Sequence, residues 1–170
     1  MVELINLHAP ALASLLDDPE KFQAEYNVSI RAHIAEIREF ALHLQQRLAS
    51  SHSDPKWCGY LVVNSQTQQV VGFCDFKGPP TKDGTVEISY SIFLEFQGRG
   101  SATHTVKQQI AVAFTESKVK RIIADTLPEH NASTRVLEKN GFKLLEAVDD
   151  TAVGLVWRWC LERGDQQLLA

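Results

Sequence analysis

The sequence has few cysteines, and they are not arranged as a disulfide framework or a metal site. Its 170 residues include three, Cys58, Cys74 and Cys160, an odd number without C-x-x-C spacing. That spacing is the usual mark of structural zinc or of a redox-active pair. Each cysteine lies in an apolar, strand-like context, so we interpret all three as buried free thiols. We expect no metal and, by default, a cytoplasmic location.

Long hydrophobic runs and excess positive charge are also missing. No apolar run approaches the roughly 18 residues of a membrane span, and the N-terminus MVELINLHAP lacks the features of a signal peptide. The formal net charge is −4 at pH 7, which gives no general attraction to nucleic acid or an anionic membrane. The composition is that of an ordinary globular protein, and the length predicts a single domain over residues 1–170.

The hydrophobic pattern predicts a mixed α/β architecture with helices on both faces of one sheet. Strands are expected over residues 2–5, 59–63, 70–76, 85–94, 121–127 and 153–161. Helices are expected over residues 9–26, interrupted at Pro10 and Asp18-Pro19, over 30–48, over 102–114 and from Asn131 to Gly141. The polar stretch 50–55 ends the second of these helices.

Two glycines stand between a strand-like run and a helix-like run in FLEFQGRGSATHTV, residues 93–106. A helix N-terminus behind glycines suits a phosphate group, because its first N–H groups lack intrahelical partners and no Cβ blocks the approach. The alternative is a plain strand-to-helix turn. A Walker loop is excluded because no Gly-Lys-Ser/Thr follows, and a dinucleotide fingerprint would need a third glycine.

The turn carries a family resemblance. It reads Gln97, Gly98, Arg99, Gly100, Ser101 and Ala102. This order resembles the Q/R-x-x-G-x-G/A motif with which the GNAT (Gcn5-related) N-acetyltransferases bind the pyrophosphate of acetyl-CoA. Downstream, LPEHNASTRVLEKNGF at 127–142 is similar to a segment of the branch that contains ribosomal-protein N-terminal alanine acetyltransferases. The likeness covers about residues 57–161 and is weak before them.

The resemblance implies a fold in which the fourth and fifth strands splay apart and hold the pantetheine arm of acetyl-CoA between them. By this likeness, backbone groups of Ile92, Phe93 and Leu94 bind the arm, and Gln97 through Ala102 hold the pyrophosphate. Asn131 and Ser133 line the other side of the cleft, near the thioester. Thr103 and Lys139 touch the periphery of the cofactor.

Acetyl transfer to an amine needs a base, because a lysine-type amine has a pKa of about 10.4. Our candidate base is Glu87, acting directly or through a water, where family members often carry a catalytic glutamate. It would otherwise be a solvent-facing or ion-paired carboxylate. Ser133 is the candidate for placing or protonating the sulfur, with helix capping as its alternative. A backbone N–H near Ile92 or Phe93 would bind the oxyanion, and no tyrosine follows Tyr90 to act as a general acid.

The function indicated is an acetyl-CoA-dependent N-acetyltransferase for a protein N-terminus or a small amine. One alternative is a GNAT-fold module that binds acetyl-CoA or a partner without turnover. Another is a generic nucleotide-binding domain, which would prefer ATP or NAD to CoA. The acceptor would enter between the N-terminal helices and the last strands. Pairing of two domains through exposed edge strands would give a homodimer.

Overall fold

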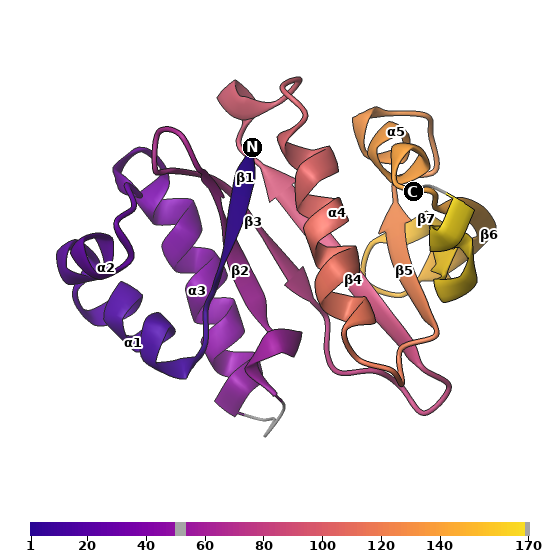
Figure 1. Ribbon diagram of the computed structural model, residues 1–170, viewed down its shortest axis with the longest axis horizontal. Coiled ribbons are helices and arrows are strands. Elements are labelled where there is room, and N and C mark those ends of the chain that lie inside the picture. Colours follow the sequence, from indigo (N-terminus) through magenta and orange to yellow (C-terminus); the bar gives the residue numbers. More distant parts are fainter. Residues whose placement is uncertain (50–53, 169–170) are drawn as a thin grey trace.

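The strand-like runs form one seven-stranded mixed sheet in the computed structural model, which describes residues 1–49 and 54–168. The spatial order is β1-β2-β3-β4-β5-β7-β6 (Figure 1). The strands are β1 (Val2–Asn6), β2 (Gly59–Asn64), β3 (Gln69–Phe76), β4 (Thr85–Ile92), β5 (Arg121–Thr126), β6 (Lys143–Asp150) and β7 (Gly154–Glu162). Neighbouring strands are antiparallel except β4 and β5, which run parallel.

Five α-helices accompany the sheet within the described residues. They are α1 (Ala9–Asp17), α2 (Pro19–Tyr26), α3 (Ile34–Ala49), α4 (Ser101–Phe114) and α5 (Ala132–Lys139). The expected break at Asp18-Pro19 separates α1 from α2, and the Asp18 side chain accepts from the Lys21 N–H to begin the second helix. A short 3-10 turn, Arg31–His33, precedes α3. The expected end of that helix falls largely on residues 50–53, outside the described residues.

The sheet separates two hydrophobic cores. The larger core joins α4 and α5 to one face of the sheet, with Val106, Ile110 and Leu137 packed against strand residues such as Ile88 and Ile122. The other core joins α1–α3 to the opposite face. Its sheet residues come from β2, β3 and the end of β4. Among the described residues, β5 and β7 contribute none to that core.

The fourth and fifth strands splay apart, as expected. They pair only between residues 85–87 and 121–123, although β4 continues to Ile92 and β5 to Thr126. Figure 1 shows the two strands meeting at one end and diverging toward the N-termini of α4 and α5. Because β5 no longer covers it, this edge of β4 beyond Glu87 has unpaired backbone groups.

The sequence analysis missed one strand. β6 was not expected, because it lies at the edge of the sheet and its first five residues are exposed. An exposed edge strand needs no alternation of apolar and polar residues, and KLLEAVDD shows none. The strand expected over 85–94 also ends earlier, at Ile92, since Leu94–Phe96 forms a 3-10 turn. Homodimer formation through an edge strand stays a prediction.

Candidate functional site

The splay between β4 and β5 contains a cleft of about 380 Å³. Its walls come from two neighbouring segments and one that is distant in sequence. They are residues 90–92 of β4, residues 96–98 and 100–103 around the glycine turn, and Ala132, Ser133, Arg135, Val136 and Lys139 of α5. The two motifs that carried the family resemblance therefore face each other across one cleft.

The glycine turn delivers an open helix N-terminus to this cleft. Gly98 and Gly100 have φ angles of 72° and 81°, in the left-handed region that L side chains rarely adopt. Gly100 is the N-cap of α4, and no side chain caps this helix. A Cβ at Gly98 would meet nothing within 4 Å, so the space before the helix is open. These features fit a phosphate group, which would accept hydrogen bonds from the first N–H groups of α4.

Gln97 has a structural contact inside the site. Its side-chain Nε2 donates to the Ile92 carbonyl at 2.8 Å. This bond ties the turn to the end of β4 and uses the carbonyl that would otherwise face the splay. Gln97 thereby fixes the position of the glycines relative to the open strand edge.

Only one of the three backbone positions expected to bind the pantetheine arm lines the cleft. The Phe93 N–H donates to the Val71 carbonyl at 2.9 Å, so it is already used within the sheet. Leu94 is 82% exposed and lies outside the cleft lining. Glu87 and Phe93 bond toward β3, and successive residues of a strand alternate in direction, so Ile92 directs its N–H into the splay.

Asn131 and Ser133, which were both expected to line the cleft, have different contacts in the structure. The Asn131 side-chain oxygen accepts from the N–H groups of Ser133 and Thr134, at 2.8 and 3.1 Å. The Thr134 hydroxyl oxygen in turn accepts a hydrogen bond from the Asn131 N–H, which completes a capping box. Asn131 is therefore the N-cap of α5 and does not line the cleft. Because Asn131 does the capping, the Ser133 hydroxyl remains free to face the cleft.

The Ser133 hydroxyl contacts a residue that sequence reasoning assigned only to the apolar side of its strand. The hydroxyl oxygens of Tyr90 and Ser133 lie 2.8 Å apart, across the space between β4 and α5. Burial raises the pKa of Tyr90, and the hydrogen bond with Ser133 opposes that rise without cancelling it. The sequence contained a signal for this contact. Four residues of the strand alternate toward the core, Val86, Ile88, Tyr90 and Ile92, and of these Tyr90 alone carries a polar group.

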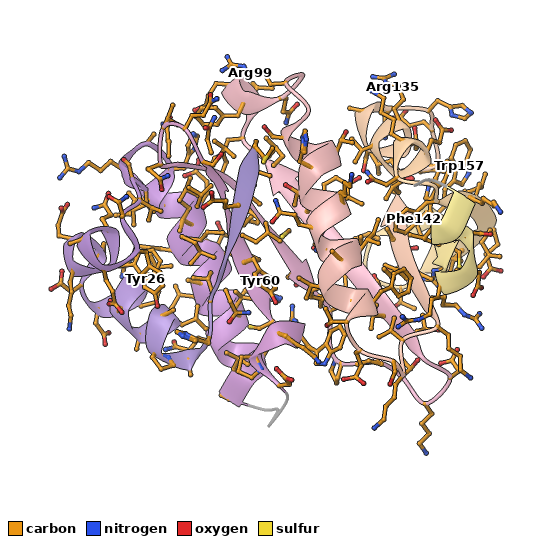
Figure 2. All side chains as sticks on the ribbon, in the orientation of Figure 1. Tyr26, Tyr60, Arg99, Arg135, Phe142 and Trp157 are labelled. Atoms are coloured by element: carbon orange, nitrogen blue, oxygen red, sulfur yellow. The ribbon has the colours of Figure 1, made fainter. Side chains whose placement is uncertain are left out.

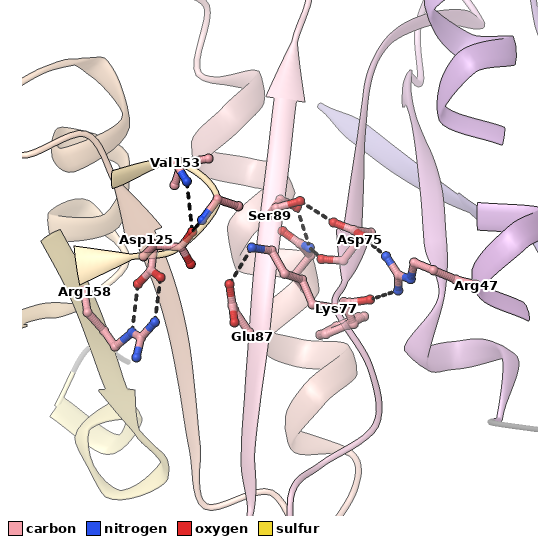
Figure 3. A network of polar contacts seen from close by, with 12 residues as sticks. Arg47, Asp75, Lys77, Glu87, Ser89, Asp125, Val153 and Arg158 are labelled. Atoms are coloured by element: carbon pink, nitrogen blue, oxygen red, sulfur yellow. Dashed lines mark hydrogen bonds and ion pairs between the residues drawn. The ribbon is translucent and has the colours of Figure 1, made fainter. Parts of the chain in front are cut away.

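Glu87 lies apart from the cleft lining, where β4 and β5 separate (Figure 3). Its carboxylate is 2.6 Å from the Lys77 ammonium, and its side chain is 25% exposed. Burial lowers the pKa of Lys77, but the hydrogen bond and charge of Glu87 outweigh burial and raise it. Glu87 lies three residues before Tyr90, about 10 Å along a strand that rises roughly 3.3 Å per residue.

Glu87 belongs to a row of charged pairs on the face of the sheet opposite α4. Figure 3 shows Asp75 with Arg47 on one side of the Lys77–Glu87 pair and Asp125 with Arg158 on the other. In the two flanking pairs the carboxylate is more buried than its partner, with side-chain exposures of 7% against 28% for Asp75 and 14% against 25% for Asp125. The carboxylates of this face are thus neutralised by cations of the same chain.

Two arginines lie at the end of the molecule that carries the glycine turn. Arg99 and Arg135 extend at the same end of the structure, from the glycine turn and from α5 (Figure 2). Arg99 lines a second, smaller cavity with Ser101 and His104 and is not part of the main cleft. Thr103 and Lys139 line the main cleft as expected, and Arg135 is an addition that the sequence motifs did not identify.

Two expected absences concern membranes and metals. None of the helices within residues 1–49 and 54–168 has both the length and the apolar character needed to cross a bilayer. Over the same residues, His, Cys, Asp and Glu side chains form no group of three placed to hold a metal ion.

Comparison with known proteins agrees with the fold. The profile of the acetyltransferase (GNAT) domain matches residues 2–143, so the chain belongs to this family. The uncharacterized N-acetyltransferase p20 of Bacillus licheniformis is 29% identical over 84 residues, which are 49% of this chain and 47% of p20. Two Bacillus subtilis relatives are matched over 59% and 61% of their lengths, so the match spans less than two thirds of each of these relatives.

Solved structures share the fold at low sequence identity. The aminoglycoside acetyltransferase AAC(6')-Ib in complex with coenzyme A is 18% identical, with a TM-score of 0.68 and coverage of 99% of this chain and 98% of that one. The ribosomal-protein-S5-alanine acetyltransferase from Vibrio fischeri is 19% identical, with a TM-score of 0.62 and coverage of 96% and 93%. These similarities establish the GNAT fold for this chain.

Proposed function

We propose that this chain binds acetyl-CoA in the cleft between β4 and α5 and transfers the acetyl group to an amine. One observation carries the proposal: the unpaired edge of β4 leads to the uncapped N-terminus of α4 behind two left-handed glycines. The helix end suits a diphosphate, through its free N–H groups and the positive end of its dipole. The strand edge suits the amide groups of the pantetheine arm, because it offers unpaired backbone donors and acceptors.

The cleft offers the cofactor two kinds of groups, backbone N–H donors and positively charged side chains. The N–H groups at the start of α4, in residues 101–103, bind the diphosphate, while Arg135 and Lys139 add positive charge from α5. The Ile92 N–H donates into the splay, either to the arm or to the carbonyl oxygen of the thioester, which gains negative charge during transfer. When bound, acetyl-CoA supplies an activated acyl group whose leaving thiol has an ordinary pKa of about 8.5.

Glu87 is the proposed base for the acceptor amine. The amine attacks only when neutral, and a carboxylate beside the open face of the sheet can remove its proton. Glu87 lies about 10 Å along the strand from Tyr90, so a proton from an amine at that end of the cleft would reach it through a chain of waters. Lys77 offsets the charge of the carboxylate and holds it at the point where the strands part.

The acceptor is proposed to be the primary amine of a protein N-terminus or of a small molecule. It would approach the face of the sheet that α1–α3 leave open, where Glu87 is accessible. The two structural neighbours named above, an aminoglycoside acetyltransferase and a ribosomal-protein alanine acetyltransferase, support this range of amines.

Calorimetric titration with acetyl-CoA, CoA, ATP and NAD tests the cofactor. We expect binding of acetyl-CoA and CoA but not of ATP or NAD. Gly100→Glu, which places a side chain and a negative charge in the phosphate path, should abolish this binding. Gly154→Glu is the matched control, since both glycines have a φ of 81° and open space around them. A wild-type protein that does not bind acetyl-CoA would overturn the proposal.

Thiol release from acetyl-CoA in the presence of amines tests the activity. The panel should include an N-terminal peptide beginning with alanine, a polyamine, an aminoglycoside and free amino acids. Release that depends on one class of amine would support transfer and identify the acceptor class. Tight acetyl-CoA binding without release for any amine would instead favour a binding module.

A further inference from the structure

We infer that Tyr90 is a positioning residue that aims the Ser133 hydroxyl at the sulfur atom of the bound thioester. Tyr90 donates a hydrogen bond to the Ser133 oxygen, and Ser133 donates a hydrogen bond to the sulfur. The inference rests on the proposed acetyl-CoA site. Its test distinguishes a failure of the inference from a failure of the proposed site.

The two hydroxyls meet inside the cleft. Tyr90 comes from β4 and Ser133 from the first turn of α5, and both line the cleft walls. Their oxygens are 2.8 Å apart, while the Tyr90 oxygen lies 3.3 Å from the Ser133 carbonyl oxygen. A hydroxyl has one proton and two lone pairs, so a Ser133 oxygen that accepts from Tyr90 keeps its proton for another partner. A sulfur atom in the cleft accepts a hydrogen bond from this proton and so favours this arrangement.

The position of this pair along the cleft is set by α5. Near its C-terminal end, Asn140 donates to the Thr103 carbonyl in the first turn of α4 at 3.3 Å. This end of α5 therefore lies beside the proposed diphosphate site. Ser133 lies at the opposite, N-terminal end of α5. Since the thiol of CoA lies at the far end of the pantetheine arm from the diphosphate, the Tyr90–Ser133 pair is at the thiol end.

Among the described residues that line the cleft, Tyr90 is the ionisable one at that end. Besides Tyr90, the ionisable residues that line the cleft are Arg135 and Lys139, both farther along α5 toward the diphosphate end. Asn131 is used as the cap of α5. The hydroxyl pair is thus a side-chain donor placed where the cleft would hold a leaving sulfur.

The pair acts by hydrogen bonding and does not transfer the tyrosine proton. As the amine nitrogen bonds to the acyl carbon, the carbon–sulfur bond breaks and its electron pair moves to sulfur. The amine proton goes to Glu87 or water, and the thiolate later takes a proton from water. Burial raises the pKa of Tyr90 above 10.0, so proton transfer to a thiolate with an ordinary pKa near 8.5 is uphill. Tyr90 polarises Ser133, and the chain of two hydroxyls stabilises the charge on sulfur.

The pKa of the CoA thiol in the bound state tests this inference without an acceptor. It is measured from the ultraviolet absorbance of the thiolate in a pH titration, with desulfo-CoA as the blank for tyrosine ionisation. We expect the wild-type protein to lower the thiol pKa by about one unit, a tenfold change in the ionisation constant. Tyr90→Phe and Ser133→Ala should both restore the ordinary value, with unchanged affinity for desulfo-CoA.

Tyr60→Phe is the matched control, since Tyr60 is also buried and donates its hydroxyl to the Lys56 carbonyl at 2.8 Å, away from the cleft. The thiol pKa of CoA bound to Tyr60→Phe should equal that of CoA bound to the wild type. A Tyr90→Phe protein with the wild-type thiol pKa would overturn the role of Tyr90, even where CoA binding persists. If Tyr90→Phe does not fold, two other results would overturn the inference. One is a wild-type protein that leaves the thiol pKa of CoA at its ordinary value, and the other is a Ser133→Ala protein that lowers this pKa as much as the wild type does. Absence of CoA binding by the wild type would overturn the proposed function and this inference with it.

Discussion

The Nζ atom of Lys77 lies 2.6 Å from the carboxylate of Glu87, at the residue where β4 and β5 stop pairing. The pair joins the residue that follows β3 to the base proposed for amine deprotonation. A carboxylate held in this way has a defined position, and its charge is offset by a cation that is 55% exposed. Removal of either partner therefore has a distinct consequence for the pH dependence of catalysis.

Glu87→Gln is expected to lower kcat/KM by about 10²- to 10⁴-fold, because the amide cannot accept the amine proton. The acid limb of the pH–rate profile should vanish. Lys77→Met should keep the limb, because the carboxylate is still present, and should lower kcat/KM less than Glu87→Gln does. Steady-state rates of thiol release across pH, with an acceptor from the amine screen, measure both. A Glu87→Gln profile that matches the wild type would exclude Glu87 as the base.

Asn131→Ser is expected to preserve both the stability of the protein and its affinity for CoA. Serine caps a helix about as well as asparagine, whereas Asn131→Ala should lower the free energy of unfolding by about 1 kcal/mol. Urea denaturation and calorimetric titration with CoA provide the two measurements. Asp18→Ala, which removes the cap of α2, is the control for cap loss away from the cleft. Weaker CoA binding by a fully stable Asn131→Ser protein would show that Asn131 contacts the cofactor.

His33 is expected to make stability depend on pH between about 6 and 8. Its Nε2 lies 2.5 Å from Glu95 and its Nδ1 3.2 Å from Glu36, and its ring stacks on Phe93. Burial lowers the pKa of His33, but the two carboxylates outweigh burial and raise it above 6.5. A raised pKa means that the folded protein binds the proton more tightly. The contribution is complete below about pH 6.5 and is lost as pH rises through the folded-state pKa.

The pKa values of Glu36 and Glu95 are lowered below 4.5, that of Glu36 by a backbone hydrogen bond and then by His33, and that of Glu95 first by His33, so their contribution is lost as pH falls toward and below that value. Urea denaturation near pH 6 and near pH 8 compares the wild type with His33→Gln. The wild type should lose more of its free energy of unfolding over this range than the variant. Equal losses would mean that the His33 contacts do not form in solution.

Arg47→Met is expected to lower the free energy of unfolding by about 2 kcal/mol, because it leaves a buried carboxylate without its cation. Asp75 is 5% exposed, and within the described part of the chain its side chain also accepts from the Ser89 hydroxyl. Arg31→Met is the matched control. It breaks an ion pair with Glu20 in which both side chains are more than 70% exposed, and such pairs contribute little. Thermal and urea denaturation of the two variants should therefore differ, and similar stabilities would contradict the prediction.

Much of the fold was predictable from local patterns. The alternation along β4, the helical spacing in α3 and α4 and the Asn131 cap follow from residues close together in sequence, and the structure confirms them. The motif resemblance correctly predicted the GNAT fold and the splay of β4 from β5. β6 was missed because an exposed edge strand is stabilised by its pairing with β7, which leaves no periodic signal.

The sequence by itself determined the elements of this protein and the two motifs of the cleft, because turn glycines, helix caps and apolar periodicity act within a few residues of the chain. Only the tertiary structure decided which groups remain free inside the cleft. The Phe93 N–H is used by Val71, Lys77 is paired with Glu87, and Tyr90 meets Ser133 from another element. These contacts join residues that are brought together by the packing of β3, β4 and α5, and hydrogen bonds between such distant residues have no local sequence signature.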